Sequence, residues 1–132
     1  MGVTQIVTVF SEEEGKEKLD RSLRLFPTKR IVFLARKERL REVVNLRNDF
    51  AIKYKLPTEI VLLEQNLKEI YDAIKVYEKD SSIVHIIDYD PLNYLLIPAS
   101  FQAGMKVYFS NGSAIEEIPN RSDVMPEKKN YV

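Results

Sequence analysis

Residues 81–119 read SSIVHIIDYDPLNYLLIPASFQAGMKVYFSNGSAIEEIP, and this stretch decides the fold. The run from Ser81 to Asp88 is apolar and β-branched, which predicts a buried strand. Proline favours the first turn of a helix and glycine the position after its end, so a helix is predicted from Pro91 to Ala103, before Gly104. A second apolar run starts at Met105. Strand, helix and strand in this order predict a parallel βαβ unit.

The residues after this unit predict an antiparallel return. Asn111 and Gly112 form a hairpin signal behind the strand that runs from Met105 to Ser110. The following SAIEEIP would then pair as the last strand of the sheet. Residues 120–132 contain too little apolar surface to fold alone and are expected to be a tail or linker.

Upstream of Ser81, strand-like and helix-like segments alternate. The apolar runs from Thr4 to Phe10, Arg30 to Ala35 and Thr58 to Glu64 predict strands. Amphipathic segments follow each of them, the longest from about Lys37 to Lys55. The sequence therefore predicts one domain over residues 1–119, an α/β, Rossmann-like three-layer α/β/α fold. Its mainly parallel six-stranded sheet ends in a strand made antiparallel by a hairpin.

The predicted helix from Pro91 to Ala103 contains no charged residue. A helix without a polar face is expected to be covered on most sides, so we expect the sheet on one side and a second subunit on the other. Pro98 cannot donate a backbone hydrogen bond and is expected to kink or loosen this helix near Tyr94.

Composition excludes several classes of protein. Twenty basic and twenty acidic residues balance, so direct binding to DNA or RNA through a global positive field is not expected. The chain has no cysteine and one histidine, His85, which we interpret as a hydrogen-bonded core residue. No signal peptide or membrane span is recognised, and we expect a cytoplasmic protein. Abundant Lys, Glu, Arg and Ile without cysteine is also typical of thermophiles.

Chemistry is expected where parallel strands end. In an open parallel sheet, ligands gather at the carboxyl ends of the strands near the point where strand order reverses. Two loops qualify: FSEEEG after the first strand, and DYDPLNY after the fourth. The acidic residues Asp88 and Asp90 could bind Mg²⁺ for phosphoryl transfer, an alternative that would also use Glu12 and Glu13. They could instead complement the dipole of the helix that follows.

The longest predicted helix begins with a basic segment. Acidic residues lie between these basic ones at salt-bridge spacing, so we interpret the segment as a solvated helix face in preference to a phosphate-contacting patch. The basic residues are Arg36, Lys37, Arg39, Arg41 and Arg47. No Gly-x-Gly-x-x-Gly or Walker loop occurs, and no cofactor is expected.

The order of elements over Thr4 to Pro119, with an apolar helix that ends in Ala-Gly and a short final hairpin, resembles the CARF family, the CRISPR-associated Rossmann fold. The resemblance implies a homodimer through the helix from Pro91 to Ala103. It also implies a pocket on the two-fold axis, where many members bind cyclic oligoadenylates and some cleave them. Carried onto this chain, the ligand-binding positions are Ser11, Tyr89 and Asn93, with no catalytic residue.

This chain departs from the family pattern in its loops. Many members have a Gly-, Thr- and Lys-containing turn that receives phosphates, where this sequence has Asp88, Tyr89, Asp90 and Pro91. Phosphates bind N–H donors and cations, so these acidic loops argue against the common form of oligoadenylate binding. The function expected is a regulatory or sensor domain linked to CRISPR or antiviral signalling. A metal-dependent enzyme and a ligand-free dimerisation module stay open as alternatives.

Overall fold

The computed structural model describes residues 2–10, 13–87, 90–111 and 114–120. Its centre is a six-stranded sheet with the order β3-β2-β1-β4-β5-β6. All neighbouring strands are parallel except β5 and β6, which pair antiparallel. The fold class predicted from the sequence is confirmed, including the antiparallel last strand. The strands are β1 (Val3–Thr8), β2 (Thr28–Ala35), β3 (Thr58–Leu62), β4 (Ile83–Ile86), β5 (Lys106–Asn111) and β6 (Ala114–Ile118).

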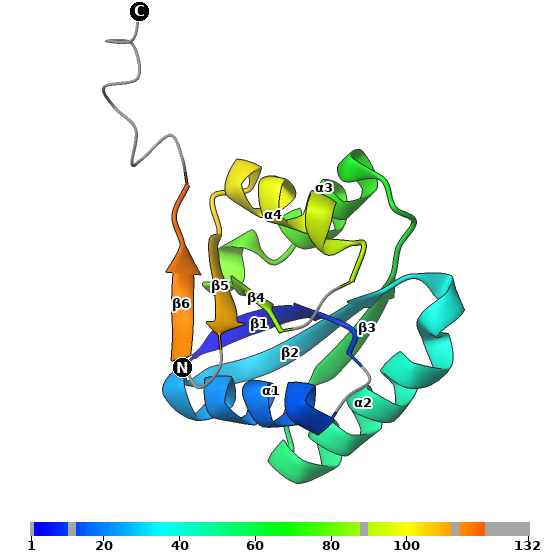
Figure 1. Ribbon diagram of the computed structural model, residues 1–132, viewed down its shortest axis with the longest axis vertical. Helices are drawn as coiled ribbons and strands as arrows, with labels where there is room; N and C mark the ends of the chain where they lie inside the picture. The colour runs from blue at the N-terminus through cyan, green and yellow to red at the C-terminus, as the bar shows by residue number, and fades with distance from the viewer. Residues whose placement is uncertain (1, 11–12, 88–89, 112–113, 121–132) are drawn as a thin grey trace, which may run out of the picture.

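Helices cover both faces of the sheet, which makes three layers (Figure 1). One layer holds α1 (Glu13–Leu25) and α2 (Leu40–Tyr54), and the other holds α3 (Leu67–Lys75) and α4 (Asn93–Gln102). Short 3₁₀ turns, η1 (Lys37–Arg39) and η2 (Glu78–Asp80), precede α2 and β4. No helix in the described ranges is long and apolar enough to cross a membrane.

Two apolar clusters form the core, one on each face of the sheet. Successive residues of a strand point to opposite faces, so Ile6 belongs to the cluster that packs under α3 and α4. Its neighbour Val7 belongs to the cluster that packs under α1 and α2. Both residues are fully buried, as a central parallel strand requires.

Local sequence signals explain how several helices begin and end. The side chain of Asn66 accepts a hydrogen bond from the backbone N–H of Glu69, which caps α3. Gly104 has φ 76°, a left-handed conformation that favours glycine, directly behind α4. Pro98 lies inside α4, which continues through it to Gln102. The helix begins at Asn93, two residues later than predicted, because Pro91 belongs to a turn that precedes it.

Candidate functional site

The site is built at the middle of the sheet, where strand order reverses. β1 pairs in parallel with β2 on one side and with β4 on the other. The register places Val7 opposite His85, so β1 and β4 end at the same edge. β1 and β4 are neighbours in the sheet, which a single site formed at the ends of both strands requires. This reversal is where ligands bind in open α/β sheets.

Asn93 lies at this edge as the first residue of α4 and is 8% exposed. The hydroxyl of Thr8, the last residue of β1, donates to the side-chain oxygen of Asn93 at 3.1 Å, and this bond is buried. It joins the end of the central strand to the start of the uncharged helix. Among the predicted ligand-binding positions, Asn93 is the one within the described residues, and it lines the pocket described below.

Asp90 lies three residues before the first residue of α4, and its side chain is 0% exposed. One carboxylate oxygen accepts the backbone N–H of Leu92 at 2.9 Å, which fixes the turn that starts the helix. The other accepts a hydrogen bond from Nη1 of Arg39 at 3.0 Å. Asp90 is therefore partnered by a helix start and by a guanidinium from a segment 51 residues away in sequence.

Arg39 corrects the interpretation of the basic segment as a solvated face. Its side chain is 17% exposed and bonds both Asp90 and Glu42. The hydrogen bond to Glu42, then that to Asp90, raises the pKa of Arg39, while burial opposes this; the same bond lowers the pKa of Glu42. The solvated-face interpretation holds for Lys37 and Arg41, which are exposed.

Arg36 is the second cation that sequence reasoning missed. Its Nε lies 4.0 Å from Oδ1 of Asp90, and its Nη1 donates to Glu38 at 3.3 Å. Arg36 directly follows the buried strand β2, the neighbour of β1. Its place behind a central parallel strand was the available signal, because such positions meet the other strand ends at one edge.

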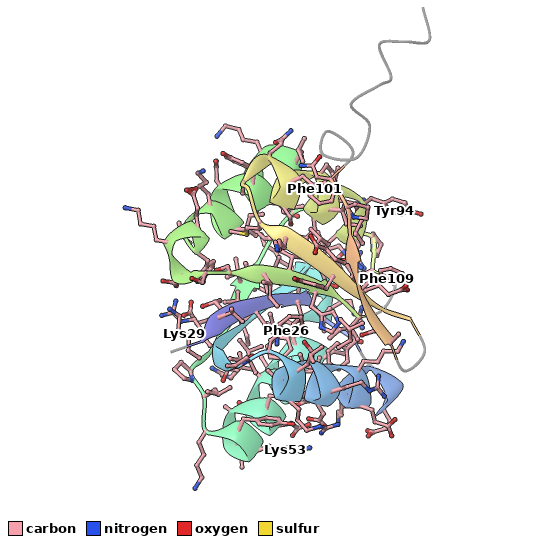
Figure 2. The ribbon with its side chains drawn as sticks, turned by 90° about the vertical axis from the view of Figure 1, so that its left-hand side faces the viewer. Phe26, Lys29, Lys53, Tyr94, Phe101 and Phe109 are labelled. Atoms are coloured by element: carbon pink, nitrogen blue, oxygen red, sulfur yellow. The ribbon has the colours of Figure 1, made fainter. Side chains whose placement is uncertain are left out.

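A pocket of about 400 Å³ opens beside Asp90 and Asn93. Its walls are mostly apolar, and polar groups of Asp90, Asn93 and Ser110 stand among them. Figure 2 shows Tyr94 of α4 and Phe109 of β5 on the same side of the molecule. The lining residues are Ile86, Ile87, Asp90, Asn93, Tyr94, Ile97, Phe109 and Ser110.

His85 lies behind the pocket and is 0% exposed. Its Nε2 is 2.8 Å from the hydroxyl of Ser110, which matches the hydrogen-bonded core histidine expected from the sequence. Burial, assisted by the positive charge of Lys18, lowers the pKa of His85 to about 4. The imidazole is therefore neutral near pH 7, and it supports Ser110 without adding charge to the pocket.

The other predicted site positions, Ser11, Asp88 and Tyr89, lie outside the described residues. Within the described ranges, no group of three or more His, Cys, Asp or Glu side chains is placed to hold a metal ion. The two oxygens of Asp90 already accept hydrogen bonds from Leu92 and Arg39.

No family model matches this sequence, and no curated protein matches it. A solved structure is similar in fold: a Type III CRISPR defence DNA nuclease activated by cyclic oligoadenylate. The TM-score is 0.67 at 12% sequence identity, over 89% of this chain. The match spans 20% of the nuclease chain, so this chain corresponds to about a fifth of it. At this identity the likeness concerns the fold alone.

Proposed function

We propose that this chain is a CARF-like regulatory domain, which binds a cyclic oligoadenylate or a related nucleotide in a pocket completed by a second copy of itself. The observation that carries this proposal is the position of the pocket. It lies beside the strand-order reversal, at the start of α4, and its lining includes Tyr94 and Ile97 of that helix. A ligand there would touch the sheet and the helix together.

The surface of α4 supports the dimer. The helix carries no charged residue, and its Tyr94 side chain is 68% exposed. Ile97 and Phe101 lie three and seven residues further along, on the same helical face, and are only partly buried. A second copy packed against the helix from Pro91 to Ala103 would cover this stripe and close the open side of the pocket.

The ligand class follows from the resemblance to CARF domains and from the similar fold of the oligoadenylate-activated nuclease. In this proposal Asn93 contacts the ligand from the start of α4, and Ser11 and Tyr89 contribute from the adjoining loops. The aromatic and aliphatic lining suits the flat face of a nucleobase, which binds well against apolar surfaces.

Thermal unfolding with and without ligand tests the proposal. Cyclic tetra- or hexa-adenylate should stabilise the protein by RT ln(1 + [L]/Kd), or about 2.7 kcal/mol at a ligand concentration 100 times Kd. Linear tetra-adenylate of the same charge type is the matched control. A protein whose unfolding temperature is unmoved by every ring size would contradict the proposal.

A ligand-free dimerisation module is a second candidate, favoured by the internal bonding of the polar groups near the pocket. Asp90 pairs with Arg39, and Asn93 accepts from Thr8, without any ligand. Such a module would sediment as a dimer and show no response to cyclic oligoadenylates. The two measurements together separate it from the sensor.

A further inference from the structure

An ion pair joins the two sides of the strand-order reversal. Arg39 follows β2, and Asp90 follows β4, while β2 and β4 flank β1 on its two sides. The 3.0 Å contact between Arg39 and Asp90 therefore spans the carboxyl end of β1. A nucleotide phosphate is commonly received at this part of a doubly wound sheet.

Beside the ion pair of Arg39 and Asp90, a second arginine has an N–H group without an acceptor in the described part of the chain. Among the described residues, Nε of Arg36 is buried and has no hydrogen-bond partner. At 4.0 Å, Asp90 is an ion-pair neighbour of this nitrogen but is beyond hydrogen-bond distance. The arrangement thus has two guanidinium groups around one buried carboxylate, with an N–H that the carboxylate does not reach.

Guanidinium groups bind phosphates well because their forked N–H donors match two oxygens at once. A phosphate has more acceptor oxygens than the carboxylate of Asp90 and can satisfy both arginines. Asp90 also lines the pocket, so the carboxylate that pairs with both arginines belongs to a residue of the pocket wall.

We infer that Arg36 and Arg39 form the phosphate-binding pair of this site, and that Asp90 is a built-in counter-ion that competes with the ligand phosphate for them. The inference rests on the proposed function for the identity of the ligand. It answers the objection that acidic loops repel phosphate for Asp90, because the charge of this carboxylate is already matched by arginines from a third loop. It also makes Asp90 a regulator of affinity, since the ligand must displace it.

The test is a calorimetric titration of inorganic pyrophosphate at low ionic strength into the wild type and variants. Asp90→Asn keeps an acceptor for the N–H of Leu92 and removes the competing charge, so it should bind pyrophosphate about tenfold more tightly. Asp72→Asn is the matched control, because it removes one carboxylate from an exposed pair with Lys68 on α3. Equal affinity of these two variants would overturn the inference.

The arginines are tested in the same titration. Arg36→Gln and Arg39→Gln should each weaken binding about tenfold. Arg47→Gln removes a guanidinium of α2 whose bond to Asn48 is exposed, and it should leave the affinity for pyrophosphate within about twofold. If all three arginine variants bind alike, the inference fails. If pyrophosphate were instead held through a magnesium ion on Asp90, the result would be opposite, because Asp90→Asn would then bind pyrophosphate more weakly.

Two further measurements guard against misfolded variants. Asp90→Ser also offers an oxygen to the N–H of Leu92 and should reproduce the gain of Asp90→Asn. In the wild type, pyrophosphate should shift the arginine Nε–H resonances of Arg36 and Arg39 in ¹H–¹⁵N spectra, with those of Arg47 unmoved. Unmoved resonances at Arg36 and Arg39 under saturating pyrophosphate would overturn the inference.

Cyclic tetra-adenylate separates this inference from the proposed function. If the wild type binds it and Arg36→Gln and Arg39→Gln bind it equally well, the function stands and the inference fails. If no variant binds it while Asp90→Asn still gains pyrophosphate affinity over Asp72→Asn, the inference stands and the proposed ligand is wrong.

Discussion

The hydroxyl of Thr8 donates a buried hydrogen bond to the side-chain oxygen of Asn93, and this 3.1 Å contact joins residues 85 positions apart. Thr8 ends the central strand β1 and Asn93 begins α4, so the bond fixes the uncharged helix against the middle of the sheet. The contact also orients a residue that lines the pocket. It therefore connects the stability of the fold with the shape of the candidate site.

Replacing Thr8 with valine tests this connection. The change keeps the shape of the side chain and removes the donor to Asn93, which should lower the free energy of unfolding by about 1 kcal/mol. Urea denaturation measures this loss. Thr58→Val is the control, because the Thr58 hydroxyl donates to a carbonyl just two residues away, at the long distance of 3.3 Å. Equal stability of the Thr8 variant and the wild type would contradict the structural role of the bond.

The pair of Arg39 and Asp90 should show strong energetic coupling. A double-mutant cycle with Arg39→Met and Asp90→Asn should give an interaction free energy of about 2 kcal/mol in urea denaturation, because both side chains are largely buried. The exposed pair of Lys68 and Asp72 provides the comparison cycle and should couple by only about 0.4 kcal/mol. Additive effects of the two substitutions would show that the contact between Arg39 and Asp90 does not stabilise the fold.

His85 should make the protein sensitive to mild acid. Its pKa is lowered to about 4 in the folded state, mainly by burial, against about 6.5 in the unfolded chain. The unfolded chain therefore binds more protons between these values, so stability falls as pH decreases from about 6.5 to about 4. The full contribution of this residue is on the order of 3 kcal/mol.

Urea denaturation of the wild type and His85→Gln at pH 7, 5.5 and 4 measures this contribution. Glutamine stays neutral and can still hydrogen-bond Ser110, so carboxylates alone would set the pH dependence of the variant. The stability difference between the two proteins should shrink or reverse as pH falls. Parallel curves would mean that His85 takes up its proton equally in the folded and unfolded states.

A charged substitution on the exposed face of α4 tests whether this face is a dimer interface. Tyr94 is 68% exposed, so Tyr94→Glu should change the stability of the isolated fold by only about 0.5 kcal/mol. It should nevertheless convert a dimer into a monomer in sedimentation velocity, because a charge would be buried against the partner copy. Ile52→Glu is a matched control, since Ile52 is 77% exposed on α2, in the other helix layer. A wild-type monomer at all concentrations would exclude this interface.

The sequence predicts most of the fold because its signals are local. Asn66 caps the start of a helix, and Gly104 lies just after the end of another. Both signals depend only on residues close by in the sequence. Alternation of apolar strands with amphipathic helices specifies the parallel sheet without knowledge of distant contacts. α4 continues through Pro98 to Gln102, and it packs along the sheet and α3. The kink expected near Tyr94 stays a prediction.

The candidate site was only partly predictable, because its contacts join residues far apart in sequence. Asn93 was identified from its place behind a strand, and it lies in the pocket. The basic segment was assigned to solvent because Glu38 and Glu42 lie at salt-bridge spacing, and Arg39 does bond Glu42. Its second bond, to Asp90, depends on strand order, which spacing along the chain does not reveal.

The hairpin between β5 and β6 brings the end of β6 close to the last turn of α4. β6 returns antiparallel, so Ile118 pairs with Val107 near the start of β5. Asn120 lines a small hollow together with Phe101 of the last turn of α4. α4 therefore has the candidate pocket at its first residue and the hollow shared with Asn120 at its last turn. With ten residues, α4 is about 15 Å long. A tilt imposed at Asn93 would therefore displace the far end of α4, where Phe101 lines a small hollow together with Asn120.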